Sequence, residues 1–272
     1  MKKDVLISTV AILALLGLVF YGATKPSPAK APIEESSLPD SKYVESAEYY
    51  DIVTNYPSRL GAIDAADASS TPLLSKVSKE ADAKAIAIMK SFVSDTIAQF
   101  KTDGNFAHLT HTDVKTLGLG PDRKEKLQIT YLIASSAHTQ SYIFTVYTDT
   151  LGAHGNIFFK TFTFNTDPSM SSGQAGSALT LSDVFSPNAD YLDTLSSLAR
   201  AKLPANIGEN ANTNMIIDGT KPESASFENF FFDNKDFVIL FAPYQVAPYS
   251  AGPQTLRINT SELSNLLKPT YR

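Results

Sequence analysis

The chain contains no cysteine and no tryptophan among its 272 residues. Without cysteine it can form neither disulfides nor thiolate metal sites, and no lipid can be attached through a thiol. Packing alone must therefore stabilise the fold. The formal net charge of −5, with no basic cluster along the chain, argues against nucleic acid as a partner.

The common catalytic signatures are also absent: no nucleophile-elbow motif, phosphate-binding glycine loop, paired-histidine zinc motif or calcium loop occurs. His108, His111 and Asp113 are close enough in sequence to suggest a zinc site, but the spacing fixes no further ligand. Solvated side chains in a polar loop are the simpler interpretation. We therefore expect no catalytic residue, no metal and no cofactor.

The amino terminus carries a long apolar run. Val5 to Ala23 contains no charged residue and is long enough to cross a thin hydrocarbon core as a helix. Lys2 and Lys3 precede the run, which predicts that everything after Lys25 lies outside the cytoplasm. A cleaved signal peptide is the alternative, but small residues at both cleavage positions are poorly placed. We expect an uncleaved, single-pass anchor in the cytoplasmic membrane.

After the apolar run, four prolines in a polar stretch predict an extended spacer. The expected organisation is a cytoplasmic tip and transmembrane anchor at 1–24, a Pro-rich linker at 25–41, and one ectodomain made of two halves, 42–170 and 171–268.

Hydrophobic periodicity within this ectodomain alternates between helix and strand patterns. Apolar residues at intervals of three and four predict helices at 78–100 and 189–203, and Thr260 is expected to cap a closing helix that runs through Leu267. Residues 104–125 show no clear period and are expected to form a loop with room for a short helical turn. Strands are expected at 49–56, 126–134, 142–147, 156–164, 227–232, 237–241 and 256–258. The sequence thus predicts an α+β fold with antiparallel sheets and packed helices, preceded by one transmembrane helix.

One segment, Ala242 to Pro253, combines three prolines with two tyrosines. The prolines prevent regular strand pairing, so the backbone must form an ordered loop. Tyr244 and Tyr249 fit two roles. Exposed tyrosines are enriched in binding surfaces, whereas inward-facing rings would fix a corner against the sheet. The residues alone leave both roles open.

The Pro-Tyr segment and its surroundings resemble a known bacterial family of domains of unknown function. This family occurs in the extracytoplasmic part of the anti-sigma factor RsiV and before the catalytic domain of the peptidoglycan deacetylase PdaC. The resemblance rests on residues 227–233, 238–253 and 261–263, and on residues 50–57, 152–156, 164–165 and 179–185.

The resemblance implies an α+β ectodomain with a role at the cell wall. In RsiV the domain is a receptor for lysozyme, so the matching loop residues Pro243, Tyr244, Val246, Pro248 and Tyr249 are the expected partner-binding residues. Two departures limit what can be carried over. Met1 to Asp4 are too short to hold a sigma factor, and no deacetylase domain is expected before Arg272.

We therefore expect a non-catalytic, membrane-anchored binding module whose ligand is peptidoglycan or a wall-active protein such as lysozyme. Two alternatives stay open. One is a wall-polysaccharide hydrolase or deacetylase-associated domain that uses carboxylates or His108, His111 and His154. The other is a purely structural envelope protein.

Overall fold

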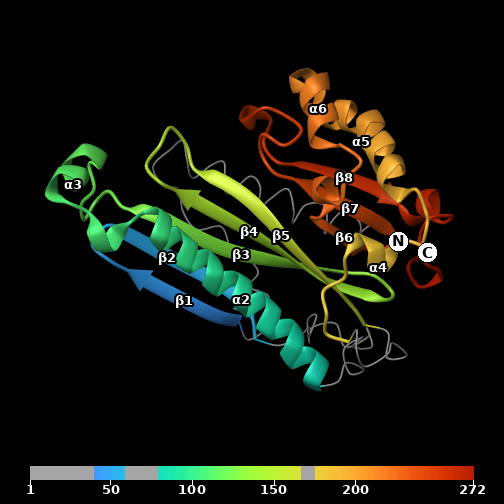
Figure 1. The fold of residues 1–272 in the computed structure, drawn as a ribbon, viewed down its shortest axis with the longest axis horizontal. Coiled ribbons are helices and arrows are strands. Elements are labelled where there is room, and N and C mark those ends of the chain that lie inside the picture. Colours follow the sequence, from blue (N-terminus) through green and yellow to red (C-terminus); the bar gives the residue numbers. More distant parts are fainter. Residues whose placement is uncertain (1–39, 59–78, 167–174) are drawn as a thin grey trace, which may run out of the picture.

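The computed structural model describes residues 40–58, 79–166 and 175–272 (Figure 1). Its strands form two sheets, each with a helix packed on its outer face. The first sheet has the order β1-β2-β3-β4-β5, and the second has the order β6-β7-β8. The predicted α+β class is confirmed.

The first sheet is built from the amino-terminal half. Its strands are β1 (Asp40–Ser46), β2 (Tyr50–Pro57), β3 (Glu125–Ser135), β4 (Thr139–Asp149) and β5 (Asn156–Asn165). The predicted antiparallel meander of β3, β4 and β5 is confirmed. β2 and β3, however, run parallel. This arrangement needs a crossover, which contains helix α2 (Lys79–Asp103), the short helix η2 (Phe106–His108) and helix α3 (His111–Leu117).

Helix α2 covers one face of this sheet because its apolar residues recur on one side. Ala85, Met89 and Val93 are buried, as the periodicity predicts. They pack against alternate residues of β4, including Phe144 and Val146. Ile143, which lies between Tyr142 and Phe144 along β4, points to the opposite face of the sheet and joins a different apolar cluster.

The second sheet contains β6 (Phe230–Asp233), β7 (Asp236–Phe241) and β8 (Gln254–Asn259), all antiparallel. The predicted hairpin is confirmed, with a two-residue turn in which Asn234 has a φ of 54°. The helices of this half are α4 (Leu181–Val184), α5 (Tyr191–Ile207) and α6 (Thr213–Gly219). Short 3₁₀ segments are η3 (Gly208–Asn210), η4 (Ser224–Phe227), η5 (Tyr249–Ala251), η6 (Thr260–Leu263) and η7 (Pro269–Tyr271).

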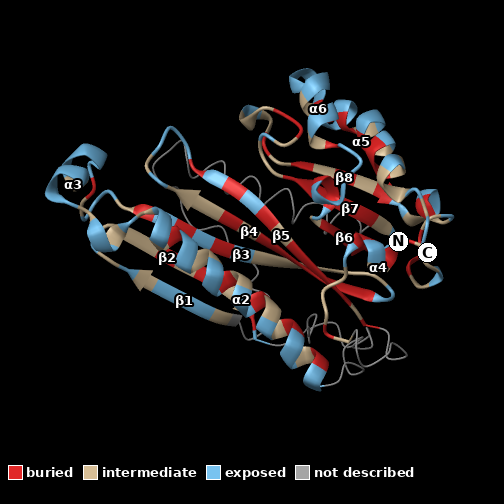
Figure 2. Ribbon diagram, in the orientation of Figure 1, coloured by how far each residue is buried: buried red, intermediate tan, exposed pale blue. Residues whose placement is uncertain are grey.

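The β6–β7 hairpin is buried on both faces, as the red strands of Figure 2 show. Phe232, Phe237 and Phe241 belong to the cluster that includes α5. On the other face, Phe231, Val238 and Leu240 belong to a cluster with β4 and β5 of the first sheet. Two hydrogen bonds tie the sheets together: Asn234 N–H donates to the Ser135 carbonyl at 2.8 Å, and the Thr163 hydroxyl to the Phe230 carbonyl at 3.2 Å. One apolar cluster therefore spans the first sheet and the hairpin of the second.

Three details differ from the sequence prediction. β1 begins at Asp40, inside the predicted linker, because its residues pair with β2 along the whole strand, from Asp40 opposite Pro57 to Ser46 opposite Asp51. The closing helix is a short 3₁₀ segment capped by Asn259 instead of Thr260, since the Asn259 side chain accepts the Ser261 N–H. Within residues 104–125, α3 forms because Thr110 and Asp113 complete a capping box.

Among the three described ranges, no helix is both long and apolar enough to cross a bilayer. The predicted anchor Val5 to Ala23 falls in residues 1–39, outside the described part of the chain, and stays a prediction. The predicted boundary between the ectodomain halves, at 170 and 171, also lies outside the described residues.

The packing between the sheets predicts that the loss of a few buried side-chain atoms will lower the free energy of unfolding markedly. Val238→Ala should lower the free energy of unfolding by about 2–3 kcal/mol, because it leaves a cavity at a fully buried position. Val44→Ala removes the same atoms from a side chain that is 59% exposed, and should change stability by less than about 0.5 kcal/mol. Urea unfolding of both variants measures the difference; equal effects would contradict the described interface.

Attachment of β1 predicts a pH dependence of stability. The Glu45 carboxylate accepts hydrogen bonds from Lys101, Tyr43 and Tyr50, which lowers its pKa from 4.5 to about 2. Because this pKa is depressed on folding, the stabilisation is complete above the unfolded pKa of 4.5 and is lost as the pH falls toward 2. Glu45→Gln should therefore destabilise the protein at pH 7, and the gap to the wild type should close near pH 2. Chemical unfolding at both pH values tests this, and a gap of constant size would refute it.

Candidate binding surface

The Pro-Tyr loop, residues 242–253, leaves the second sheet at the end of β7 through a tight turn. Gln245 N–H donates to the Ala242 carbonyl at 3.1 Å, which closes a four-residue turn with Pro243 and Tyr244 at its centre. Pro243 supplies the fixed φ that such turns favour at their second position. Tyr244 occupies the third position with a φ of 69°. A left-handed conformation there normally selects glycine or asparagine, so a tyrosine at this site is strained.

Buried residues on both sides of the loop hold this turn in place. Val246 and Ala247 are 0% and 1% exposed and belong to the α5 cluster. The Gln245 amide N–H₂ donates to the Gly219 carbonyl at 3.3 Å and to the Ser226 carbonyl at 3.1 Å. A Cβ at Gly219 would lie 1.9 Å from the Gln245 carbonyl oxygen, so only glycine permits this approach. The loop is therefore a fixed part of the fold.

Tyr244, Tyr249 and His154 form a cluster that we call the aromatic surface. The His154 ring stacks on Tyr249 with centroids 3.7 Å apart, and its Nε2 lies 3.2 Å from the Tyr244 hydroxyl. The Tyr249 hydroxyl donates to the Gly155 carbonyl at 2.7 Å. A Cβ at Gly155 would lie 2.3 Å from the Tyr147 ring, so the β4–β5 loop needs glycine at this point.

Exposure separates the roles of the two tyrosines. Tyr249 is half-buried, and burial is the main cause that raises the pKa of its phenol. Tyr244 is 56% exposed, more than any other described tyrosine or phenylalanine. Tyr249 thus packs a corner, whereas Tyr244 is presented to solvent, and its role in binding stays a prediction.

The predicted partner-binding residues therefore differ in how far they are exposed. Pro243, Pro248 and Tyr249 are half-buried, and Tyr244 is exposed. Val246 must be removed from the contact set, because its side chain is fully enclosed in the core. Its β-branched apolar side chain serves the packing of the loop. The sequence analysis did not connect His154 with this loop, since 90 residues separate it from Tyr244.

The other two histidines considered for catalysis, His108 and His111, lie elsewhere. His108 ends η2 and His111 begins α3, and both are exposed. The Asp113 carboxylate accepts the Thr110 hydroxyl and N–H, and these bonds lower its pKa. In the described ranges, no group of three histidine, aspartate or glutamate side chains is arranged to hold a metal ion. Asp113 therefore acts as a helix cap.

A solved protein of the DUF3298 family from Bacteroides fragilis has a similar fold. The TM-score is 0.53 at 17% identity, covering 85% of this chain and 93% of that protein. A DUF3298-family protein from Pseudomonas aeruginosa PAO1 has a TM-score of 0.50 at 12% identity, over 86% and 96% of the two chains. At these identities the similarity concerns the fold alone.

The chain is also 29% identical over 184 residues to the peptidoglycan-N-acetylmuramic acid deacetylase PdaC of Bacillus subtilis. The match covers 67% of this chain but 36% of PdaC, so the chain spans about a third of that relative. Residues 182–261, from α4 through β8 and including the Pro-Tyr loop, match the family described as "Protein of unknown function (DUF3298)". The predicted resemblance to a domain-of-unknown-function family and to PdaC is confirmed: residues 182–261 are similar to the DUF3298 family, and the chain is similar to part of PdaC.

Proposed function

We propose that this protein is a binding module of the bacterial cell envelope that presents its aromatic surface to peptidoglycan. The observation that carries the proposal is the conformation of Tyr244. Its backbone occupies a region that favours glycine, yet a large ring is kept there and more than half exposed. Strain of this kind, maintained by a rigid surrounding, is a recognised sign of a functional position.

The chemistry of the surface suits a saccharide. The Tyr244 and His154 rings offer flat apolar faces, and the Tyr244 hydroxyl and the imidazole nitrogens offer hydrogen-bonding groups beside them. A sugar ring presents an apolar face edged by hydroxyls. The similarity to PdaC, whose name identifies peptidoglycan as its substrate, supports this choice of ligand.

Binding is favoured over catalysis by the surroundings of His154. Its ring nitrogens contact the Gly155 carbonyl and the Tyr244 hydroxyl, and its face contacts Tyr249. No carboxylate accompanies it in these contacts, so the group that orients a catalytic histidine is not supplied there.

The proposal includes the location of the protein. Val5 to Ala23 would anchor the chain in the cytoplasmic membrane, with Lys2 and Lys3 inside and the ectodomain outside. The Pro-rich residues 25–39 would then separate β1 from the bilayer.

A wall-active protein such as lysozyme is the second candidate ligand. Tyrosine presented on a rigid loop is characteristic of protein-binding surfaces, because its large ring loses little conformational entropy on binding. The resemblance to the RsiV ectodomain points to the same class of partner.

Tyr244→Gly provides the test. The substitution removes the exposed ring and relieves the left-handed strain, while glycine's larger freedom in the unfolded chain opposes that gain. We expect the free energy of unfolding to change by less than about 1 kcal/mol, and retention of the full chain on purified peptidoglycan to fall about tenfold or more.

Co-sedimentation with peptidoglycan and with immobilised lysozyme measures binding to each of the two candidate partners. Tyr43→Ala, which removes another exposed tyrosine from β1, serves as the control and should bind as the wild type does. Retention on lysozyme but not on peptidoglycan would favour the second candidate. Retention on neither, by a folded wild-type chain, would defeat the proposal.

A further inference from the structure

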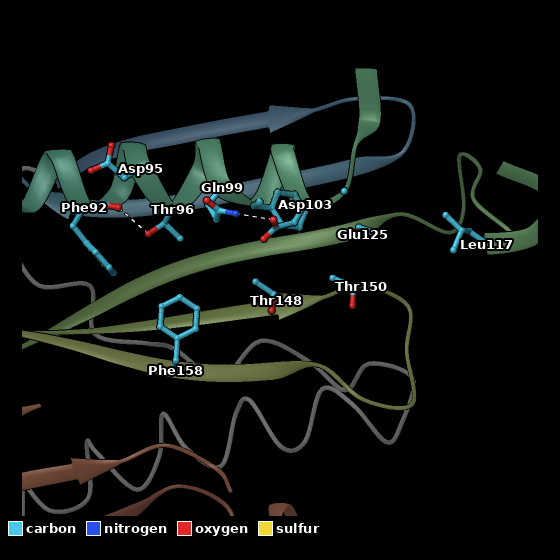
Figure 3. Close-up of a pocket in the computed structure, with 12 residues that line it drawn as sticks. Phe92, Asp95, Thr96, Gln99, Asp103, Leu117, Glu125, Thr148, Thr150 and Phe158 are labelled. Carbon is cyan, nitrogen blue, oxygen red and sulfur yellow. Dashed lines mark hydrogen bonds between the residues drawn. The ribbon is translucent and has the colours of Figure 1, made fainter. Parts of the chain in front are cut away.

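A cleft lies between the second half of α2 and the strands β3 to β5, on the α2 side of the first sheet (Figure 3). Its volume is about 690 Å³. Phe92 and Thr96 project from the helix, and the Phe158 ring rises from β5 toward them. The lining residues of α2 run as far as Asp103, which makes the cleft roughly 16 Å long at 1.5 Å per residue.

Glu125 is the unusual residue of this cleft. It lines the cleft at the start of β3 and is 7% exposed. Its carboxyl group makes no hydrogen bond or ion pair with any described residue. Burial, and secondarily the charge of Asp149, raises the pKa of this carboxyl group. An ionised carboxylate in this position costs stability unless water in the cleft or a ligand supplies a partner.

The lining is acidic without a balancing base. Asp95 and Asp103 join Glu125, and none of the described residues that line the cleft is a lysine or an arginine. Asp103 also ends α2, where the helix dipole adds negative potential. The site is therefore complementary to a cationic group. The described residues offer no arrangement of three acidic or histidine ligands, which favours an organic cation over a metal ion.

The rest of the lining points to a ligand with both apolar and hydroxyl-bearing surfaces. Phe158 is 40% exposed, although an aromatic ring of this size is usually covered. Thr148 and Thr150 lie beside it with hydroxyl groups, and the Gln99 amide on the helix donates to the Asp103 carboxylate at 2.6 Å. Simple polyamines lack the hydroxyls that such groups would pair with, whereas an amino sugar has an apolar ring face, hydroxyls and an ammonium group.

We propose that this cleft binds an oligosaccharide that contains amino sugars with free amines, with Glu125 pairing with an ammonium group and Phe158 packing against a sugar ring. The length of the cleft exceeds that of a single sugar ring, so the ligand is an oligomer.

The cleft is separate from the aromatic surface. Thr148 lines the cleft, while the adjacent Tyr147 points to the other face of the sheet and contacts Gly155 beneath the aromatic surface. The inference therefore stands on its own residues and does not depend on what the aromatic surface binds.

Calorimetric titration of the full chain with glucosamine tetramer tests the proposal, with the N-acetylated tetramer as the matched ligand. The free-amine tetramer should bind, and the acetylated one should bind at least about tenfold more weakly, because the amide carries no charge for Glu125. Glu125→Gln should weaken binding of the free-amine tetramer by about tenfold or more. The same variant should keep or raise the thermal midpoint, since it removes a buried charge.

Glu80→Gln is the control, because it makes the same change at an exposed position of α2 outside the cleft. It should leave binding unchanged. The proposed function is tested separately, by retention of the full chain on peptidoglycan, so failure of one test leaves the other standing. Three results would overturn the inference: no binding of the free-amine tetramer, equal binding of both tetramers, or wild-type affinity in Glu125→Gln. Spermidine binding more tightly than the tetramer would also overturn it, in favour of a polyamine site.

Discussion

The structure depends on the β6–β7 hairpin, whose side chains are buried on both faces. Alternate residues pack against α5 on one side and against β4 and β5 on the other. A strand pair that is apolar on both faces cannot remain in water, so it must lie between two layers. This requirement joins the two sheets and fixes where β7 ends. It thereby fixes the start of the Pro-Tyr loop.

The aromatic surface follows from that placement. The loop cannot swing away because Val246 and Ala247 are enclosed in the same core and the Gln245 side chain bonds to two other segments. Because these contacts already order the loop, holding Tyr244 in its turn adds little to the conformational entropy that the chain loses on folding. Rigid presentation of an aromatic ring is what a binding surface needs, because little freedom is then lost when a ligand arrives.

Two glutamates of the first sheet have opposite environments. Glu45 collects three hydrogen-bond donors, which lowers its pKa and fastens β1 to β2 and α2. Glu125 is buried with no described partner, which raises its pKa. The first arrangement stabilises the fold and the second opposes it. A folded protein can keep a buried, unpaired carboxyl group such as that of Glu125 where function compensates for the lost stability. The proposed binding of a cation in the cleft is such a function.

Local sequence determined much of the fold. The period of α2, the alternation in β4 and β5, and the apolar arms of the second hairpin all predicted elements that the structure contains, because these patterns reflect which face must be buried. The prolines and tyrosines of residues 242–253 likewise marked an ordered loop. The sequence did not reveal β1, whose polar residues are fastened by Lys101, or the cap at Asn259, where several residues compete for the same backbone donors.

Only the tertiary structure decided what the side chains of the two sites do. It brought His154 to Tyr244 across 90 residues and enclosed Val246, which the sequence had placed on the surface. It also gathered Glu125, Asp103 and Phe158 around one cleft. The physical reason is the same in each case: a pattern along the chain reports local periodicity, whereas exposure and pairing depend on which distant segments pack alongside.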